Sequence, residues 1–206
     1  MTAAGYAPVT LSSARLTLRP ISAASAEDYL PTYGNADAMA MLGGPWDLAR
    51  CRDNARANEL RWTRQGFASW LVDLIDEAGK THCAVALLGF GDAKGDVVGF
   101  GWIVAPEYQR RGIARESSRL ALDWFFANFD LTVLTETIPA NEPSIAASAA
   151  MGFALDHVSE TEYVCSMSRA QYRHDPRNSS NSAVVSSRPT NDARLSHRST
   201  ARGPSS

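Results

Sequence analysis

The sequence predicts a mixed α/β protein with a mostly antiparallel central sheet flanked by helices. Three strand-like runs follow one another between residues 67 and 104 with short glycine-bearing connections, which is typical of an antiparallel meander. Two helix-like runs precede the meander, and helices alternate with strands after it. The predicted element order is therefore β-α-α-β-β-β-α-β-α-β.

The elements before the meander are indicated by alternation and by capping residues. Residues 15–19 alternate with a period of two, which predicts a first strand. Ser25 is a candidate N-cap for the first helix. Asp47 is a candidate N-cap for a second helix, which extends to about residue 64 and stops at Gly66.

The meander strands are expected over 67–76, 82–90 and 97–104. In the first of them, Trp70, Val72 and Leu74 share one face, which predicts that this face is buried. The elements that follow are a helix over 116–128, a Thr-rich strand over 131–138, a short helix over 141–150 with Gly152 at its end, and a last strand over 162–168.

Composition and charge divide the chain of 206 residues into a folded part and a tail. The net charge is −2; residues 173–206 hold six Arg and two Asp, hence +4, which leaves −2 − 4 = −6 for residues 1–172. The tail is rich in Ser and Arg and has too few apolar residues to offset chain entropy. We expect a loose N-terminal arm over 1–10, a folded domain over 11–172, and a disordered basic tail over 173–206.

Several classes of function are disfavoured. The three cysteines form no C-x-x-C pair, so neither a zinc site nor a disulfide framework is indicated, and no metal is expected. The N-terminus does not resemble a signal peptide and no apolar run is long enough to span a bilayer, so a cytoplasmic protein without membrane contact is expected. The tail is typical of a solubilising extension, and polyanion binding is the alternative; nucleic acid is disfavoured because no aromatic residue is interleaved for stacking.

The most specific signal is the loop Q-R-R-G-I-A at 109–114, between a predicted strand and a predicted helix. The first N–H groups of a helix lack intrahelical partners, and the helix dipole adds positive charge there. Gly112 lets the backbone approach an anion closely, and Arg110, Arg111 and Arg115 add formal charge. The pattern suits a diphosphate, with a solvated basic turn as the alternative; neither a Walker A motif nor G-x-G-x-x-G is present.

This loop resembles motif A of the GNAT N-acetyltransferases, Q/R-x-x-G-x-G/A, which grips the pyrophosphate of acetyl-CoA. The predicted element order is also that of the GNAT fold, and the resemblance covers roughly residues 12–170. Within this family the chain is most similar to the RimJ/RimL-type branch. The shared motifs are R-L-x-L-R-P at 15–20, Gly-Pro-Trp at 44–46, A-P-E-Y before the loop, and N-x-x-S…G-F at Asn141, Ser144, Gly152 and Phe153.

The resemblance implies an N-acetyltransferase that moves an acetyl group from acetyl-CoA to a primary amine by direct attack. It implies that the backbone of Trp102, Ile103 and Val104 holds the pantetheine arm as an added strand. Asn141 matches the family asparagine that contacts pantetheine, and it is also well suited to cap a helix. The residues expected at the pyrophosphate are Gln109, Arg110, Arg111, Gly112, Ile113, Ala114 and Arg115.

The resemblance is incomplete at the proton donor. Many GNAT enzymes place a Tyr seven residues after the asparagine, where this chain has Ser148. The RimJ/RimL-type branch resembles this chain in carrying a serine three residues after it, here Ser144. The Ser144 hydroxyl is a candidate hydrogen-bond donor to the departing thiolate, and the alternative is that it satisfies a local backbone group.

The chain also departs from the family pattern at the general base. Relatives often carry Glu in the third meander strand, where this chain has Gly99. Glu136 and Glu162 are the remaining candidates, and the alternative is that both are only solvated. An α-amine with a pKa near 8 is roughly 10% neutral at pH 7, whereas a lysine near 10.4 is neutral about 250-fold less often.

A site without a strong base therefore favours the α-amine of a peptide or protein as the acceptor, with a small-molecule amine as a second option. The alternative function is a catalytically weak GNAT-like domain that binds acyl-CoA or a partner. Both a monomer and a homodimer fit the sequence.

Overall fold

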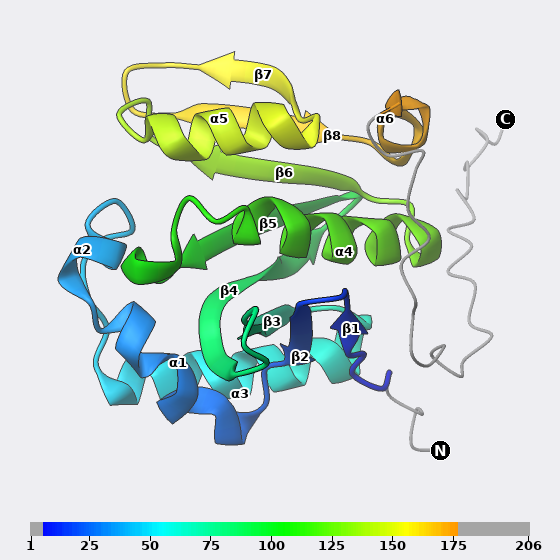
Figure 1. Cartoon of the computed structure of the whole chain (residues 1–206). Coiled ribbons are helices and arrows are strands. Elements are labelled where there is room, and N and C mark those ends of the chain that lie inside the picture. The colour runs from blue at the N-terminus through cyan, green and yellow to red at the C-terminus, as the bar shows by residue number, and fades with distance from the viewer. Residues whose placement is uncertain (1–5, 177–206) are drawn as a thin grey trace, which may run out of the picture.

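The computed structural model describes residues 6–176, which form an eight-stranded sheet with helices on both faces (Figure 1). The strand order is β1-β2-β3-β4-β5-β6-β8-β7, and every neighbouring pair is antiparallel except β5 and β6. This confirms the predicted mixed α/β class with a mostly antiparallel sheet.

The strands are β1 (Leu11–Ser12), β2 (Leu16–Pro20), β3 (Ser69–Ile75), β4 (Thr81–Lys94), β5 (Val97–Val104), β6 (Thr132–Thr137), β7 (Ala154–Val158) and β8 (Tyr163–Met167). The helices are α1 (Ala26–Tyr33), α2 (Ala36–Met39), α3 (Leu48–Gln65), α4 (Ile113–Asn128), α5 (Glu142–Met151) and α6 (Arg169–His174), with 3₁₀ turns η1 (Ala23–Ser25) and η2 (Pro106–Tyr108).

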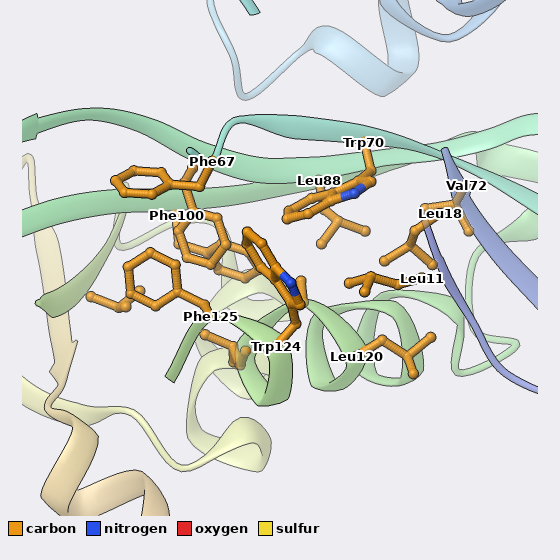
Figure 2. Packing of buried hydrophobic residues seen from close by; sticks show 14 of the residues in the cluster. Leu11, Leu18, Phe67, Trp70, Val72, Leu88, Phe100, Leu120, Trp124 and Phe125 are labelled. Atoms are coloured by element: carbon orange, nitrogen blue, oxygen red, sulfur yellow. The ribbon is translucent and has the colours of Figure 1, made fainter. Parts of the chain in front are cut away.

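The larger of two hydrophobic cores lies between the sheet and α4 (Figure 2). Trp70, Val72 and Leu74 of β3 are all buried in it, which confirms the face predicted from their alternation. Trp124 and Phe125 of α4 pack against them, with Trp70 and Trp124 rings 5.5 Å apart in an edge-on arrangement. Aromatic residues of this size dominate core energetics, so this packing fixes the position of α4 and of its N-terminus.

The second core lies between the opposite face of the sheet and the helices α1 and α3. Tyr29 of α1, Cys51 of α3 and Leu71 of β3 are each fully buried there, and Ile103 of β5 joins them. The backbone of β5 is thus held between two packed layers, one on each face of the sheet.

Most predicted caps are observed. The Asp47 side chain accepts a hydrogen bond from the backbone N–H of Arg50 at 2.8 Å, and Gly66 ends α3 in the left-handed region. Ser25 occupies the predicted N-cap position of α1, but its side chain bonds elsewhere. It lies inside η1, where its hydroxyl accepts from the backbone N–H of Ser22 at 3.1 Å, and it makes no capping bond to α1.

The prediction missed β1, β7 and α6, and the single helix expected from Ser25 is divided into α1 and α2. β7 is exposed along its whole length, so it lacks the alternation that reveals a half-buried strand. α6 begins at Ser168, whose side chain forms a capping box with Gln171, and it crosses the boundary expected at residue 172. The helix expected from residue 116 starts at Ile113 instead, directly after Gly112.

Residues 6–10, expected within a loose arm, pack against the domain. Val9 is buried, and its carbonyl accepts a 2.7 Å hydrogen bond from the indole N–H of Trp70. The backbone N–H of Tyr6 bonds to the carbonyl of Thr63 at 3.3 Å. The tail from residue 177 onward lies outside the described residues, so its expected disorder stays a prediction.

Candidate functional site

The site begins where β5 and β6, the one parallel pair, separate. Their pairing covers only Val97–Gly99 against residues 132–134. Beyond Gly99, β5 continues to pair with β4 as far as Val104, whereas β6 pairs on its other side with β8. The edge of β5 that faces β6 therefore has backbone groups without a strand partner, and an extended ligand can pair with such an edge.

A groove of about 760 Å³ runs along this separation. That volume is within the range of small-molecule sites, roughly 300–1,000 Å³. The groove brings together most of the residues singled out in the sequence, namely Trp102, Ile103, Val104, Gln109, Arg110, Gly112, Ile113, Ala114, Arg115, Glu136, Asn141 and Ser144. Arg111 and Glu162 are the two predicted site residues that do not line it.

The loop at the start of α4 presents a series of backbone donors to the groove. Gly112 is the N-cap with φ 75°, and Arg110 also has a positive φ, 59°. Within residues 6–176, the N–H groups from Arg110 to Arg115 have no hydrogen-bond partner. Successive free N–H groups at a helix start form a concavity that attracts anions.

Arg15 holds this loop in place from the β1–β2 turn. Its guanidinium donates to the carbonyl of Arg111 at 3.0 Å and to the carboxylate of Glu116 at 2.8 Å. The hydroxyl of Ser13 donates to the same carboxylate at 2.6 Å. Glu116 lies in the first turn of α4, and these contacts offset the negative charge that it would otherwise place beside the loop.

A second hollow of about 330 Å³ adjoins the loop and shares Gly112 and Arg115 with the groove. Arg115 forms no ion pair with the other residues between 6 and 176, so its charge is available to a ligand. The remaining lining residues are basic, acidic and apolar: Arg15, Glu116, Arg119, Leu122, Ala150, Met151 and Tyr172. This hollow therefore combines positive charge with an apolar wall.

Glycines line the groove on the α1 and α3 side of the sheet, at Gly89 and Gly91 of β4 and Gly99 and Gly101 of β5. A Cβ added at Gly99 or Gly101 would meet no atom within 4 Å. The position where GNAT relatives often carry Glu is therefore open space in this chain.

Residues of α1, α2 and α3 also line the groove, among them Tyr33, Ala38 and Asn54. Tyr33 lines the groove, its ring packs on Trp46 at 4.5 Å, and burial raises the pKa of its phenol. Met41 and Leu42 also line the groove and are about half exposed. Trp46 does not line the groove, and the guanidinium of Arg50 lies 4.4 Å above its ring.

The start of α5 supplies two polar side chains. Asn141 is the N-cap, and its side-chain oxygen accepts from the backbone N–H of Ser144 at 3.3 Å. Neither the amide nitrogen of Asn141 nor the hydroxyl of Ser144 bonds to any other group between residues 6 and 176. Ser148 is buried, and its hydroxyl donates to the carbonyl of Ser144 at 3.0 Å.

The two candidate carboxylates lie in different places. Glu136 is on β6, exposed, and lines the groove. Glu162 lies in the turn between β7 and β8, where its N–H donates to the hydroxyl of Ser159 at 3.0 Å. The predicted roles of both stay predictions.

Between residues 6 and 176, no three His, Cys, Asp or Glu side chains gather in a way that could hold a metal ion. In that stretch no helix combines the length and the apolar character needed to cross a bilayer.

Comparison with known proteins identifies the family. The model of the acetyltransferase (GNAT) domain matches residues 15–154. Among solved structures, the chain is similar to an acetyltransferase from Agrobacterium tumefaciens, with a TM-score of 0.65 and 24% identity over 81% of this chain and 98% of that one. It is also similar to a ribosomal-protein-S5-alanine acetyltransferase from Vibrio fischeri, with a TM-score of 0.61 and 16% identity over 78% and 97% of the two chains.

A further similar structure is an aminoglycoside acetyltransferase in complex with coenzyme A, with a TM-score of 0.60 and 13% identity over 78% of this chain and 98% of that one. At these identities the structural likeness shows the fold. The domain match shows more, and the chain belongs to the GNAT acetyltransferase family. It is an acetyl-CoA-dependent acyltransferase that transfers an acetyl group to an amine.

Proposed function

We propose that this enzyme holds acetyl-CoA along the free edge of β5, with the diphosphate on the loop at 110–115, and acetylates the α-amine of a peptide or protein. The observation that carries the proposal is the row of free N–H groups from Arg110 to Arg115 at the mouth of the β5–β6 separation. A diphosphate needs several donors and positive charge at one point, and the start of α4 supplies both.

The rest of acetyl-CoA matches the neighbouring surfaces. The unpaired edge of Trp102, Ile103 and Val104 offers backbone groups to the amides of pantetheine, and the free amide nitrogen of Asn141 offers a donor. The hollow beside Arg115 suits the phosphorylated nucleoside, since it combines cations with an apolar wall. Each part of the co-substrate thus has a surface of fitting chemistry.

In the reaction, the amine nitrogen attacks the thioester carbonyl carbon, the carbon–sulfur bond breaks, and the thiolate leaves. Ser144 is the proposed hydrogen-bond donor to the thiolate, because its hydroxyl is unpartnered and on the groove. Glu136 is the proposed acceptor of the amine proton through a water, since it lines the groove. Glu162 is the second candidate and would have to act from the β7–β8 turn.

The proposed acceptor follows from the absence of a strong general base on β5. Gly99 leaves β5 without a carboxylate, so an amine that is already partly neutral at pH 7 is favoured, and an α-amine meets this condition better than lysine. The N-x-x-S motif at Asn141 supports placement in the RimJ/RimL-type branch. The similar Vibrio fischeri structure is a ribosomal-protein-S5-alanine acetyltransferase, which agrees with a protein acceptor.

Binding and turnover can be tested separately. Saturating acetyl-CoA is expected to raise the melting temperature, since a ligand at 100-fold over its Kd stabilises a protein by about 2.7 kcal/mol. Thiol release is then measured with peptides, lysine analogues and small amines. Binding without thiol release for any amine would favour the alternative, a catalytically weak acyl-CoA-binding domain. The lack of any thermal shift would contradict the proposed co-substrate site.

A further inference from the structure

Three side chains form a hydrogen-bonded chain that ends at Tyr108, two residues before the diphosphate loop at 110–115. Asp76, after β3, lies with its Oδ2 2.8 Å from Nε2 of His82 in β4. The Nδ1 of His82 lies 3.0 Å from the hydroxyl of Tyr108, the last residue of η2. Tyr108 lines the groove, whereas His82 and Asp76 do not.

The Asp76 end of the chain is firmly fixed. Its Oδ1 accepts from the backbone N–H groups of Ala78 at 3.0 Å and Lys80 at 2.9 Å. The hydrogen bond with His82, followed by the one from Lys80, holds the pKa of the Asp76 carboxyl below its usual range. An ionised carboxylate only accepts, so Nε2 of His82 donates to Asp76, and in the tautomer with its proton on Nε2 the Nδ1 accepts from the Tyr108 hydroxyl.

The other end of the chain reaches the loop through the ring of Tyr108. The guanidinium of Arg111 lies over this ring, 5.3 Å from its centre, while His82 meets the ring edge-on at 5.7 Å. The carbonyl of Arg111 is held separately by Arg15. Arg111 is therefore fixed at its backbone by one element and at its side chain by another.

These contacts matter because the loop has little packing of its own. Residues 109–112 are all exposed, and Arg110 adopts a positive φ that side chains rarely adopt. An exposed turn with such a conformation would otherwise occupy many arrangements, and a ligand would have to order it on binding. Restraints on either side of Arg110 keep the free N–H groups aligned before the ligand arrives.

We propose that His82 is a positioning residue for the diphosphate of acetyl-CoA, acting through Tyr108 and Arg111 on the loop at 110–115. The proposal rests on the proposed co-substrate site. It adds that the tightness of binding depends on a histidine that lies outside the groove. A purely structural role of His82 in the β3–β4 hairpin predicts a different outcome, because it would not distinguish ligands with a diphosphate from ligands without one.

The test compares acetyl-CoA with S-acetylpantetheine, which has the thioester and pantetheine but no diphosphate. For His82→Ala, the KM for acetyl-CoA is expected to rise about five- to tenfold, the loss typical of one hydrogen bond. The kcat at saturating acetyl-CoA and the kcat/KM for S-acetylpantetheine are expected to stay within about twofold. The preference of the enzyme for acetyl-CoA over S-acetylpantetheine therefore falls by the same five- to tenfold.

A second variant and a control complete the experiment. Tyr108→Phe keeps the ring under Arg111 but removes the bond to His82, so it is expected to raise the KM for acetyl-CoA to a similar extent. The double variant is expected to lose no more than His82→Ala alone, since both changes break the same connection. His157→Ala removes an exposed histidine on β7. It is expected to leave the kinetic constants for both acetyl-CoA and S-acetylpantetheine unchanged.

The outcomes separate the two proposals. A preference for acetyl-CoA that is unchanged in His82→Ala, or an equal loss for both ligands, overturns the role of His82. Additive losses in the double variant overturn the proposed connection through Tyr108. If the unaltered enzyme shows no preference for acetyl-CoA over S-acetylpantetheine, the loop does not bind the diphosphate, and the proposed co-substrate site falls together with the inference.

Discussion

Arg15 and Glu116 form an ion pair across the N-terminus of α4. Two guanidinium nitrogens of Arg15 approach Oε2 of Glu116, Nη2 at 2.7 Å and Nε at 2.8 Å. The same guanidinium also holds the carbonyl of Arg111. The pair thus ties the β1–β2 turn to the diphosphate loop and screens a carboxylate that lies one turn into the helix.

Replacing Arg15 with Ala is expected to weaken acetyl-CoA binding more than folding. The stability loss should be about 1 kcal/mol or less, because the pair is partly exposed. The Kd for acetyl-CoA should rise several-fold, since Glu116 is left unpaired beside the anion site. Calorimetric titration measures this Kd, and the double change Arg15→Ala with Glu116→Gln should recover part of the affinity. A double variant that binds no better than Arg15→Ala would rule out the charge argument.

Gly112→Ala should lower both stability and acetyl-CoA affinity. An alanine at φ 75° is strained by roughly 1–2 kcal/mol, and its Cβ, 3.7 Å from Nη2 of Arg15, would hinder the close approach of an anion to the backbone. Gly95→Ala is the matched control, because Gly95 has φ 64° in the open turn between β4 and β5 and does not line the groove. Both variants should lose similar thermal stability, but only Gly112→Ala should raise the KM for acetyl-CoA, by about tenfold or more. Equal KM values would argue against the loop as the anion site.

Gly99→Glu should introduce the carboxylate that β5 lacks. The position has room for a side chain and lines the groove. A positioned base typically contributes 10²–10⁴-fold, so acetylation of lysine analogues at pH 7 is expected to rise by about tenfold or more. Gly99→Gln is the control, which has a similar shape and no basic group. A pH–rate profile shows the effect, and an identical response of the two variants would count against the missing-base account.

Substitutions at Asn141 and Ser144 should have different effects, the first on helix capping and acetyl-CoA binding and the second on the chemical step. Asn141→Ala removes the cap of α5 and is expected to lower stability by about 1 kcal/mol and raise the KM for acetyl-CoA. Ser144→Ala keeps the backbone N–H that Asn141 caps, so the stability should be unchanged. Its kcat is expected to fall by about tenfold or less, because a thiol with a pKa near 8.5 leaves readily. Melting curves and steady-state kinetics distinguish the two. Unchanged kcat in Ser144→Ala would remove it from the mechanism.

Much of the fold was predictable because its signals are local. The alternation in β3 and the caps at Asp47 and Gly152 each depend on a few neighbouring residues. The sequence did not predict β7, because an edge strand that is exposed on both faces shows no hydrophobic alternation. α6 did have a usable signal in its S-x-x-Q capping box at Ser168.

The anion loop was also predictable, since strand, basic glycine loop and helix follow one another in the sequence. The contacts that hold it were not, because Arg15 is 101 residues from Glu116 and His82 is 26 residues from Tyr108. Such pairs are set by how the elements pack, and a single sequence gives no sign of them. For the same reason the sequence does not distinguish Glu136, which lines the groove, from Glu162, which does not.

The most direct test is to offer the enzyme acetyl-CoA and one peptide that carries both a free N-terminus and a lysine side chain. Tandem mass spectrometry of the product locates the acetyl group. The account predicts that the acetyl group appears first on the N-terminal α-amine, with the lysine modified at least tenfold more slowly at pH 7, in line with the difference in neutral amine. Faster acetylation of the lysine would contradict the proposed acceptor.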